Sequence, residues 1–391
     1  MIGQGVWSSL VGQRPAIEVL ATAARAAATG AGGMTHAWLF TGPPGSGRSV
    51  AARAFAAALQ CLADPPGCGA CQSCRTVLAG THPDVRNVVP EGLSISVAEM
   101  RSLVQAASRR PAGGRWQVLV IEDADRLTEG ASNALLKAVE EPPARTVFLL
   151  CAPSDHPDDV AITIRSRCRL VALRTPSAAD IADVLRERDG IDPSVATWAA
   201  SVSGGHVGRA RRLATDPDAR TRRDAVLAVP VALRGATDPF AAASALVTAA
   251  ENEAVELTRS RDESEKAELE IALGKGGTGR GAAAASRGTV GAVRELERRQ
   301  KSRATRTQRD SLDRALVDLA GFYRDVLTVA LGADIALTHP DRAADIRAAA
   351  ASGPTAALHR LEAVLACREA IDLNVKPRIA LDALVTILRH P

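Results

Sequence analysis

The sequence predicts an α/β domain with a parallel sheet, followed by two all-helical domains. Short apolar runs alternate with helix-like stretches as far as about residue 172, which is the pattern of a parallel sheet. A glycine-rich loop lies between the first apolar run and the helix after it. Beyond Cys168 no stretch alternates as a strand does. These observations predict a sheet domain over 1–172, a small helical domain over 173–216 and a larger helical domain over 217–391.

Composition agrees with a helix-rich protein that needs no crosslink to fold. The 391 residues are enough for two or three cores, and 46% hydrophobic with 3% aromatic residues indicates cores of Ala, Leu and Val. The net charge of +4 excludes a strongly basic protein. The first residues lack the basic and apolar regions of a signal peptide, and no apolar run reaches the roughly 18–20 residues of a membrane span. We therefore expect a cytoplasmic protein without membrane contact.

The elements of the first domain follow in order from the N-terminus. Residues 6–30 have a helical pattern, and HAWLF at 36–40 has the apolar character of a buried strand. SVAARAFAAALQ predicts the helix after the loop, and Ser96 with Glu99 forms a capping box that opens another helix. WQVLVIEDAD is apolar until it ends in acids, as a central parallel strand is. ASNALLKAVEE predicts a helix, TVFLLCA a strand, and Thr175-Pro176 the start of the second domain's first helix.

The glycine-rich loop has the spacing of a phosphate-binding P-loop, G-x-x-x-x-G-K-[ST], with arginine in place of lysine. Glycines let the backbone wrap around phosphates, the following helix offers its N-terminal amides, and the final serine is a magnesium ligand in such loops. The planar arginine fits this cradle less well, so we expect a site that admits ATP or ADP with magnesium without hydrolysing it. The alternative is an ordinary flexible turn. The loop residues are Gly42, Pro43, Pro44, Gly45, Ser46, Gly47, Arg48 and Ser49.

Two carboxylates at the end of the second apolar strand complete the predicted nucleotide site. In P-loop enzymes one carboxylate there holds magnesium and the next polarises the attacking water. Glu122 and Asp123 stand in the reverse of the usual Asp-Glu order, and a displacement of about 1 Å costs on the order of a hundredfold in rate. The alternative is that both, with Asp125, only solvate the strand end. Together with the arginine, the reversal predicts a pocket without catalytic function.

Four cysteines between residues 61 and 74 have the spacing of a metal site. In a reducing compartment such crowding favours metal over disulfides, and four thiolates suit tetrahedral zinc. A site closed by four thiolates has no open position, so we expect a structural Zn²⁺. The alternative is a set of independent buried thiols. The predicted ligands are Cys61, Cys68, Cys71 and Cys74.

A polar stretch over about 258–309 interrupts the helical pattern of the third domain. Gly, Ser and charge concentrate there, which predicts a mobile insertion between helices. Residues 275–309 hold ten Lys or Arg against two Glu, an excess that suits nucleic acid, although a solvated loop is the favoured interpretation.

Several of these strings, in this order, resemble the bacterial DNA polymerase III clamp loader, an AAA+ family. The resemblance covers roughly 6–215, and NVKPRIALDALV at 374–385 is similar to the end of the family's helical collar domain. It implies an AAA+ sheet domain, a helical lid and a collar that joins subunits. The strings are LVGQ at 10–13, HAWLF-x-GPPGSGR, the cysteine insertion, NALLKAVEEPP at 133–143 and Ser166-Arg167-Cys168.

The departures in the P-loop and the acidic strand end resemble the delta-prime type of subunit. The gamma/tau motor keeps the lysine and the Asp-Glu order. The resemblance then implies a pentameric ring with motor and delta subunits that loads a sliding clamp onto primed DNA. In that ring Arg167 would act in trans as an arginine finger on the neighbouring motor subunit's ATP. Ala152-Pro153 stands where active members place a phosphate-sensing threonine, and whether Arg209 is a second sensor stays open.

Two other functions stay open on the sequence alone. One is a self-sufficient ATPase motor of the gamma/tau kind, in which Arg48 still serves ATP. The other is a nucleic-acid-binding module built from the cysteine loop and the basic stretch. A lone surface arginine without a role is the default alternative for Arg167.

Overall fold

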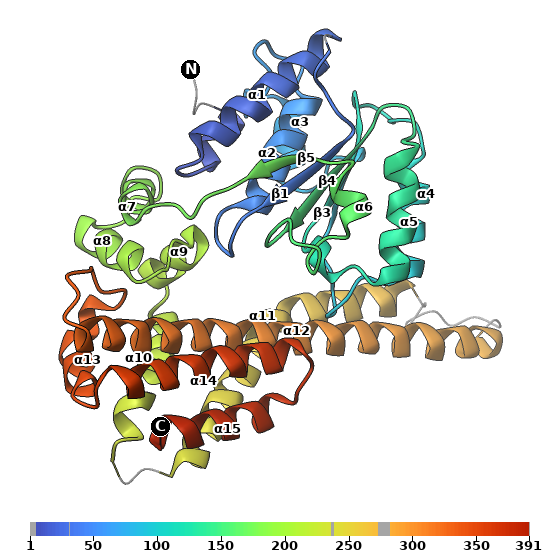
Figure 1. The fold of residues 1–391 in the computed structure, drawn as a ribbon. Helices are drawn as coiled ribbons and strands as arrows, with labels where there is room; N and C mark the ends of the chain where they lie inside the picture. The colour runs from blue at the N-terminus through green and yellow to red at the C-terminus, as the bar shows by residue number, and fades with distance from the viewer. Residues whose placement is uncertain (1–4, 31, 236–237, 273–281, 391) are drawn as a thin grey trace. The chain divides into compact units, whose positions relative to one another are not determined.

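A computed structural model describes residues 5–30, 32–235, 238–272 and 282–390, apart from the side chains of 272 and 282–290. The chain divides into two units, Met1–Thr215 and Asp216–Pro391, here called the first and the second unit. The first unit builds its core on a sheet and the second on packed helices (Figure 1).

The sheet of the first unit has five parallel strands, which confirms the predicted fold class. Their order is β2-β3-β4-β1-β5, so that β1 lies between β4 and β5. The three inner strands are buried at every position. The two edge strands have exposed residues and no long apolar run, which is why the sequence pattern did not reveal them. The strands are β1 Ala37–Thr41, β2 Val85–Val88, β3 Gln117–Ile121, β4 Thr146–Ala152 and β5 Arg169–Ala172.

Helices cover both faces of the sheet because alternate strand residues point to opposite sides. Trp38 and Phe40 pack on the side of α1 (Arg14–Thr29) and α2 (Arg48–Gln60). Trp38 meets Phe55 of α2 edge-on at 4.9 Å between ring centres. On the other face lie α4 (Val97–Ala107) and α5 (Glu129–Glu140), as Figure 1 shows. The shorter elements are η1 Gly5–Ser9, α3 Gln72–Leu78, η2 Ala124–Arg126 and α6 Ile162–Arg165.

Helix starts follow local capping chemistry, with one difference from the sequence prediction. Ser96 accepts a hydrogen bond from the Glu99 amide, as the predicted capping box requires. The helix after β5, however, is capped by Ser177, which accepts from the amide of Asp180, and not by Thr175. Serine is the stronger cap, and the helix begins after it. The helices that end the first unit are α7 Ala178–Glu187, α8 Pro193–Ser201 and α9 Val207–Thr215.

All secondary-structure elements in the described part of the second unit are helices. Its core gathers around α12 (Ala282–Ala330), where Leu319, Phe322 and Val326 are fully buried. The other helices are α10 Pro217–Ala232, α11 Pro239–Ala272, η3 Pro340–Arg342, α13 Ala343–Ala350, α14 Pro354–Asp372 and α15 Pro377–Arg389. Among the described helices, none combines the length and apolar character that a membrane span needs.

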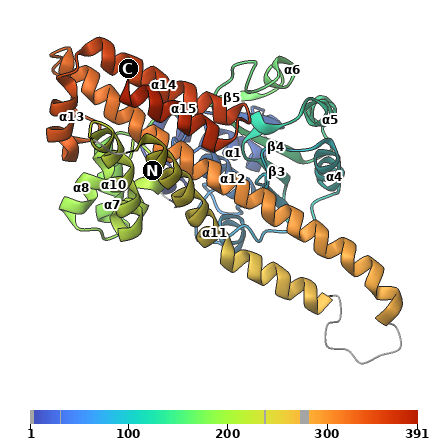
Figure 2. The ribbon, with the colours of Figure 1, turned by 90° about the horizontal axis from the view of Figure 1, so that it is seen from below.

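The mobile insertion predicted over 258–309 is helical wherever the structure describes it, so that prediction is corrected. Helices α11 and α12 run antiparallel side by side through this stretch (Figure 2). Their seam is polar: the buried guanidinium of Arg303 contacts Asp262 at 2.6 Å and Glu265 at 2.5 Å. Ion pairs hold these two helices together here, in place of the apolar stripe by which a packed helix is usually predicted from its sequence. Lys275 and the glycines near it lie outside the described residues.

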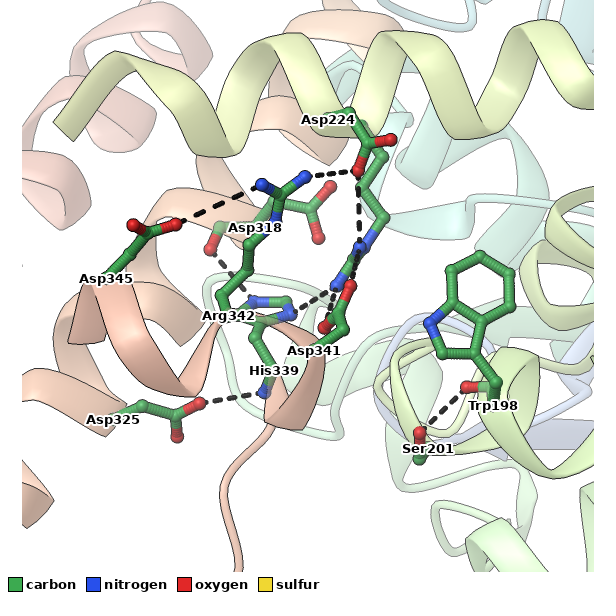
Figure 3. A network of polar contacts seen from close by, with 10 residues as sticks. Trp198, Ser201, Asp224, Asp318, Asp325, His339, Asp341, Arg342 and Asp345 are labelled. Atoms are coloured by element: carbon green, nitrogen blue, oxygen red, sulfur yellow. Dashed lines mark hydrogen bonds and ion pairs between the residues drawn. The ribbon is translucent and has the colours of Figure 1, made fainter. Parts of the chain in front are cut away.

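A buried polar network links three helical elements of the second unit (Figure 3). Arg223 on α10, 3% exposed, donates to both carboxylate oxygens of Asp341 at 2.6 and 3.0 Å, and its Nη2 is 3.0 Å from Nδ1 of His339. Nε2 of His339 faces the backbone oxygen of Asp318 at 3.1 Å. The carboxylate of Asp325 accepts the amide of His339 at 2.8 Å. A neutral imidazole that accepts at Nδ1 and donates at Nε2 satisfies every contact.

Candidate functional site

The P-loop joins β1 to α2 and has the conformation that its glycines allow. Gly42, Gly45 and Gly47 have φ of 151°, 87° and 92°, a region that residues with a Cβ rarely adopt. A Cβ on Gly42 would lie 2.6 Å from the backbone oxygen of Leu173 and from Oγ of Ser46. A Cβ on Gly45 would lie 2.6 Å from Cβ of His206, the residue before α9. The loop is therefore closely packed and not an ordinary flexible turn.

Gln13 ties the P-loop to the segment that follows β5. Its side chain is 4% exposed, and its amide nitrogen donates to the backbone oxygens of Ser46 at 3.2 Å and Arg174 at 2.6 Å. Its amide oxygen accepts from the backbone N–H of Arg174 at 3.2 Å. One side chain thus satisfies backbone groups from distant parts of the first unit.

Three buried polar atoms around the P-loop have no hydrogen-bond partner within the described structure. They are Oγ of Ser46, Nη1 of Arg48 and Oδ1 of Asp125. Burial followed by the nearby Asp123 charge raises the pKa of Asp125, while Arg48 opposes the rise. An orphaned hydroxyl and guanidinium beside a helix N-terminus suit an anion such as a phosphate group.

The two predicted acidic ligands differ in their surroundings. Oε1 of Glu122 accepts from Nδ2 of Asn87 on β2 at 2.8 Å, so this carboxylate is already engaged. Asp123 has a φ of 54°, uncommon for a residue other than glycine, and precedes η2. Ser49, the last residue of the P-loop, accepts a hydrogen bond at its backbone oxygen from Nε of Arg53 at 3.2 Å. Sequence reasoning missed Asn87 because β2 has no apolar pattern.

The four cysteines form a cluster that could hold a metal ion. Their sulfur atoms all lie within 4.8 Å of one another, and Sγ of Cys61 is 3.7 Å from that of Cys68 and 3.9 Å from that of Cys71. Sulfurs arranged tetrahedrally at about 2.3 Å from zinc are about 3.8 Å apart, so the spacing fits. The amide of Cys71 donates to Sγ of Cys68, and that of Cys74 to Sγ of Cys71, both at 3.4 Å. Such bonds stabilise thiolates.

The elements around the cluster fix its geometry. Cys61 directly follows α2, Cys71 caps α3, and Cys74 lies within α3. Burial raises the pKa of Cys61, but backbone hydrogen bonds, first that of Cys68, lower it from 9.0 to about 7. Burial raises the pKa of Cys74, so that thiol ionises only if a cation replaces its proton. The backbone oxygen of Gly67 accepts from the amide of Val6 at 3.0 Å, which attaches the loop to η1.

Arg167 lies just after α6 with its side chain 40% exposed. Its Nη2 is 2.7 Å from Oε1 of Glu140, and its Nη1 donates to the backbone oxygen of Thr163 at 2.9 Å and to Oγ of Ser166 at 3.2 Å. It lines an open hollow with His36, Val139, Glu140 and Glu141. The guanidinium is thus accessible and already oriented.

The expected sensor position at Ala152-Pro153 lies beside the P-loop, and Arg209, for which a sensor role was left open, lies on α9. Ala152 ends β4, and the backbone oxygen of Pro153 accepts the amide of Gly42 at 3.1 Å. Arg209 lies on α9, and its backbone amide donates to Nδ1 of His206 at 3.2 Å. Whether the Arg209 side chain is a second sensor stays open.

Comparison with known proteins shows that residues 13–177 of the first unit are similar to DNA polymerase III subunits. Residues 13–177 match the family described as "DNA polymerase III, delta subunit". DNA polymerase III subunit delta' of Bacillus subtilis is 34% identical over 173 residues, which are 44% of this chain and 51% of the relative. The delta' subunit of Escherichia coli is 38% identical over 146 residues, 36% of this chain and 43% of the relative.

Gamma/tau subunits are also similar to part of this chain. That of Mycobacterium tuberculosis is 36% identical over 149 residues, 37% of this chain and 25% of the relative. A DNA polymerase III gamma subunit-related protein from Thermotoga maritima is 15% identical, with a TM-score of 0.43, over 95% of this chain and 98% of its own. The chain spans about half, or less, of the length of the curated relatives it matches.

The parallel sheet, the P-loop and the four-cysteine cluster define an α/β domain of the P-loop class with a cysteine insertion. Within that class, residues 13–177 are similar to the delta' type of DNA polymerase III subunit.

Proposed function

We propose that this chain is the delta-prime subunit of a DNA polymerase III clamp loader and supplies Arg167 to the ATP of an adjacent motor subunit. It would act in a pentameric ring with gamma/tau and delta subunits, which uses ATP to load a sliding clamp onto primed DNA. Its own P-loop would bind ATP or ADP without turnover. The family match over residues 13–177 and the similarity to delta' relatives support the assignment to this complex.

The observation that carries the role in trans is the contrast between Arg167 and the chain's own pocket. Arg167 is exposed and held by three contacts, while Glu122 is engaged by Asn87 and arginine stands in the P-loop lysine position. A guanidinium aimed outward can stabilise charge on a neighbour's γ-phosphate, a contribution of about 10³–10⁵ in rate at a single site.

The cysteine cluster would hold a structural zinc ion in this proposal. The sulfur spacing fits tetrahedral zinc, and four thiolates leave no position for a substrate. Bound zinc would replace a local core that the loop lacks, and would fix the ends of α2 and α3.

The test uses the assembled loader. Capture of this chain from cell extract should bring the other polymerase III loader subunits with it. In the reconstituted complex, Arg167→Ala should lower DNA-stimulated ATP hydrolysis while subunit assembly is unchanged. Arg165→Ala is the matched control, because Arg165 is also exposed but pairs with Asp155 at 2.6 Å. Equal hydrolysis in the Arg167 variant and the wild type would remove the proposed role.

A second candidate function is a self-sufficient ATPase motor. It is favoured by the 36% identity to a gamma/tau subunit and by the orphaned Ser46 and Arg48 atoms, which a phosphate would satisfy. The isolated chain distinguishes the two: turnover abolished by Ser49→Ala would establish the motor, and absence of turnover would reject it.

A further inference from the structure

We propose that Glu140 is a positioning residue for Arg167, holding the guanidinium in the orientation from which it meets the neighbour's phosphate. This inference rests on the proposed role of Arg167 in trans. Glu140 belongs to the NALLKAVEEPP string, to which the sequence assigned no chemistry of its own.

The contacts of the guanidinium leave one part of it available. Arginine has five N–H donors, and three are engaged: one by the Glu140 carboxylate, one by the Thr163 carbonyl and one by the Ser166 hydroxyl. Among the described residues, the Nε hydrogen and one Nη2 hydrogen of Arg167 have no acceptor. Both Arg167 and Glu140 have side chains 40% exposed. A phosphate oxygen that approaches from solvent therefore finds two donors already fixed in direction.

Glu140 is itself held in place by the protein. It is the last residue of α5, and the residues before it, Ala138 and Val139, are buried in the core. The backbone oxygen of Val139 is 2.8 Å from Nε2 of His36, directly before β1. The C-terminal end of α5 adds a partial negative charge that favours a cation at this point. The carboxylate that contacts Arg167 is thus held at the packed C-terminal end of α5, close to the start of β1.

Preorganisation of this kind has a modest and measurable effect. A long arginine side chain loses conformational freedom when it binds an anion, and a partner that restricts it beforehand reduces that cost. An exposed ion pair contributes at most about a fivefold effect. Because the finger acts on charge that develops during hydrolysis, loss of Glu140 should lower kcat and leave KM for ATP unchanged.

The experiment compares reconstituted loader complexes that contain the wild-type chain, Glu140→Ala, Glu140→Gln, Arg167→Ala or the double variant Glu140→Ala with Arg167→Ala. Glu140→Ala should lower the kcat of DNA-stimulated hydrolysis about two- to fivefold. Glu140→Gln, whose amide oxygen still accepts a hydrogen bond, should lose less. Glu141→Ala is the matched control: Glu141 lines the same hollow and is exposed, and no ion pair joins it to Arg167 in the described structure.

The double variant decides between positioning and a general structural role. If Glu140 acts through Arg167, removing it should change nothing once Arg167 is absent. A further loss in the double variant, or wild-type kcat in Glu140→Ala while Arg167→Ala is impaired, would overturn the inference and leave the proposed function standing. Wild-type hydrolysis in Arg167→Ala would instead overturn the proposed function and this inference with it.

Discussion

Mild acid is expected to destabilise the second unit through His339. This imidazole is 1% exposed, and burial lowers its pKa below the ordinary value of 6.5. The Arg223 charge adds to this decrease, whereas the Asp318 and Asp325 charges oppose it without cancelling it. The folded unit therefore holds the ring neutral, whereas the unfolded chain protonates it as pH falls below about 6.5. Stability should be highest above that pH, fall through it, and level off once pH is below the folded pKa.

The structure sets the size of this effect. One histidine exchanges one proton, so the free energy of unfolding can fall by at most about 1.4 kcal/mol per pH unit. A protonated ring would place a donor at Nδ1 against the Arg223 guanidinium at 3.0 Å. The titration of Asp341 does not overlap with that of His339. Burial raises the pKa of Asp341, but the hydrogen bond from Arg223 holds this pKa below its ordinary value, so the carboxylate titrates at lower pH.

Tyr323 gives an assay for this unit alone. It is the only tyrosine of the chain, is 3% exposed and lies in the second unit, whereas all four tryptophans lie in the first. Fluorotyrosine incorporated at this position would give one fluorine NMR signal, and urea titrations at several pH values would give the unfolding free energy. His82 in the first unit also has a pKa lowered by burial, so a signal specific to the second unit is needed.

His339→Gln is the control for the proton. Glutamine can accept from Arg223 and donate to the Asp318 carbonyl but does not titrate. Its unfolding free energy should be nearly flat over the pH range in which that of the wild type falls. Parallel pH dependence in the two proteins would refute the assignment to His339.

Three further predictions concern the cysteine cluster, the buried carboxylate of Asp84 and the buried guanidinium of Arg303. The purified chain should hold about one zinc ion, and Cys74→Ser should lose most of it by elemental analysis while Cys168→Ser keeps it; equal zinc in both would exclude the cluster. Asp84 is 2% exposed and accepts hydrogen bonds from three backbone amides at 2.6–3.0 Å. Asp84→Asn should therefore lower the free energy of unfolding of the first unit by about 2–4 kcal/mol, measured by urea unfolding with tryptophan fluorescence. An unchanged free energy of unfolding would contradict this. Arg303→Met should lower the local stability of α11 by about 2–3 kcal/mol, measured as faster amide hydrogen exchange in that helix. The difference from the wild type should shrink as pH falls toward the pKa of Glu265, which the Arg303 hydrogen bond lowers to about 2. Unchanged exchange in α11 would show that the polar seam is dispensable.

The parts of the fold that the sequence predicted are those whose physics is local. Strands β1, β3 and β4 are buried on both faces and therefore read as unbroken apolar runs. Edge strands β2 and β5 have mixed exposure, so their sequences look like loops. The 258–309 part of the α11–α12 pair was misjudged because its seam is built from Arg303, Asp262 and Glu265, and these ionic contacts leave no apolar period in that stretch.

The candidate site divides in the same way. The P-loop and cysteine cluster depend on spacing within one segment, which a sequence displays directly. The contacts of Asn87 with Glu122 and of Glu140 with Arg167 join residues far apart in the chain, so only the fold brings them together. The hydrogen bonds between the Gln13 side chain and the backbone of Arg174 also join residues far apart in the chain, so the sequence does not reveal them.

The place of β1 in the sheet has a consequence for synthesis on the ribosome. Its neighbours, β4 and β5, are both encoded much later, with Ala37 beside Phe148 and Trp38 beside Arg169. A nascent chain therefore carries an unpaired, largely apolar strand until most of the first unit has left the exit tunnel. Chaperones that recognise extended apolar segments have their longest opportunity at residues 37–41, and slowed translation beyond the P-loop helix would prolong that exposure.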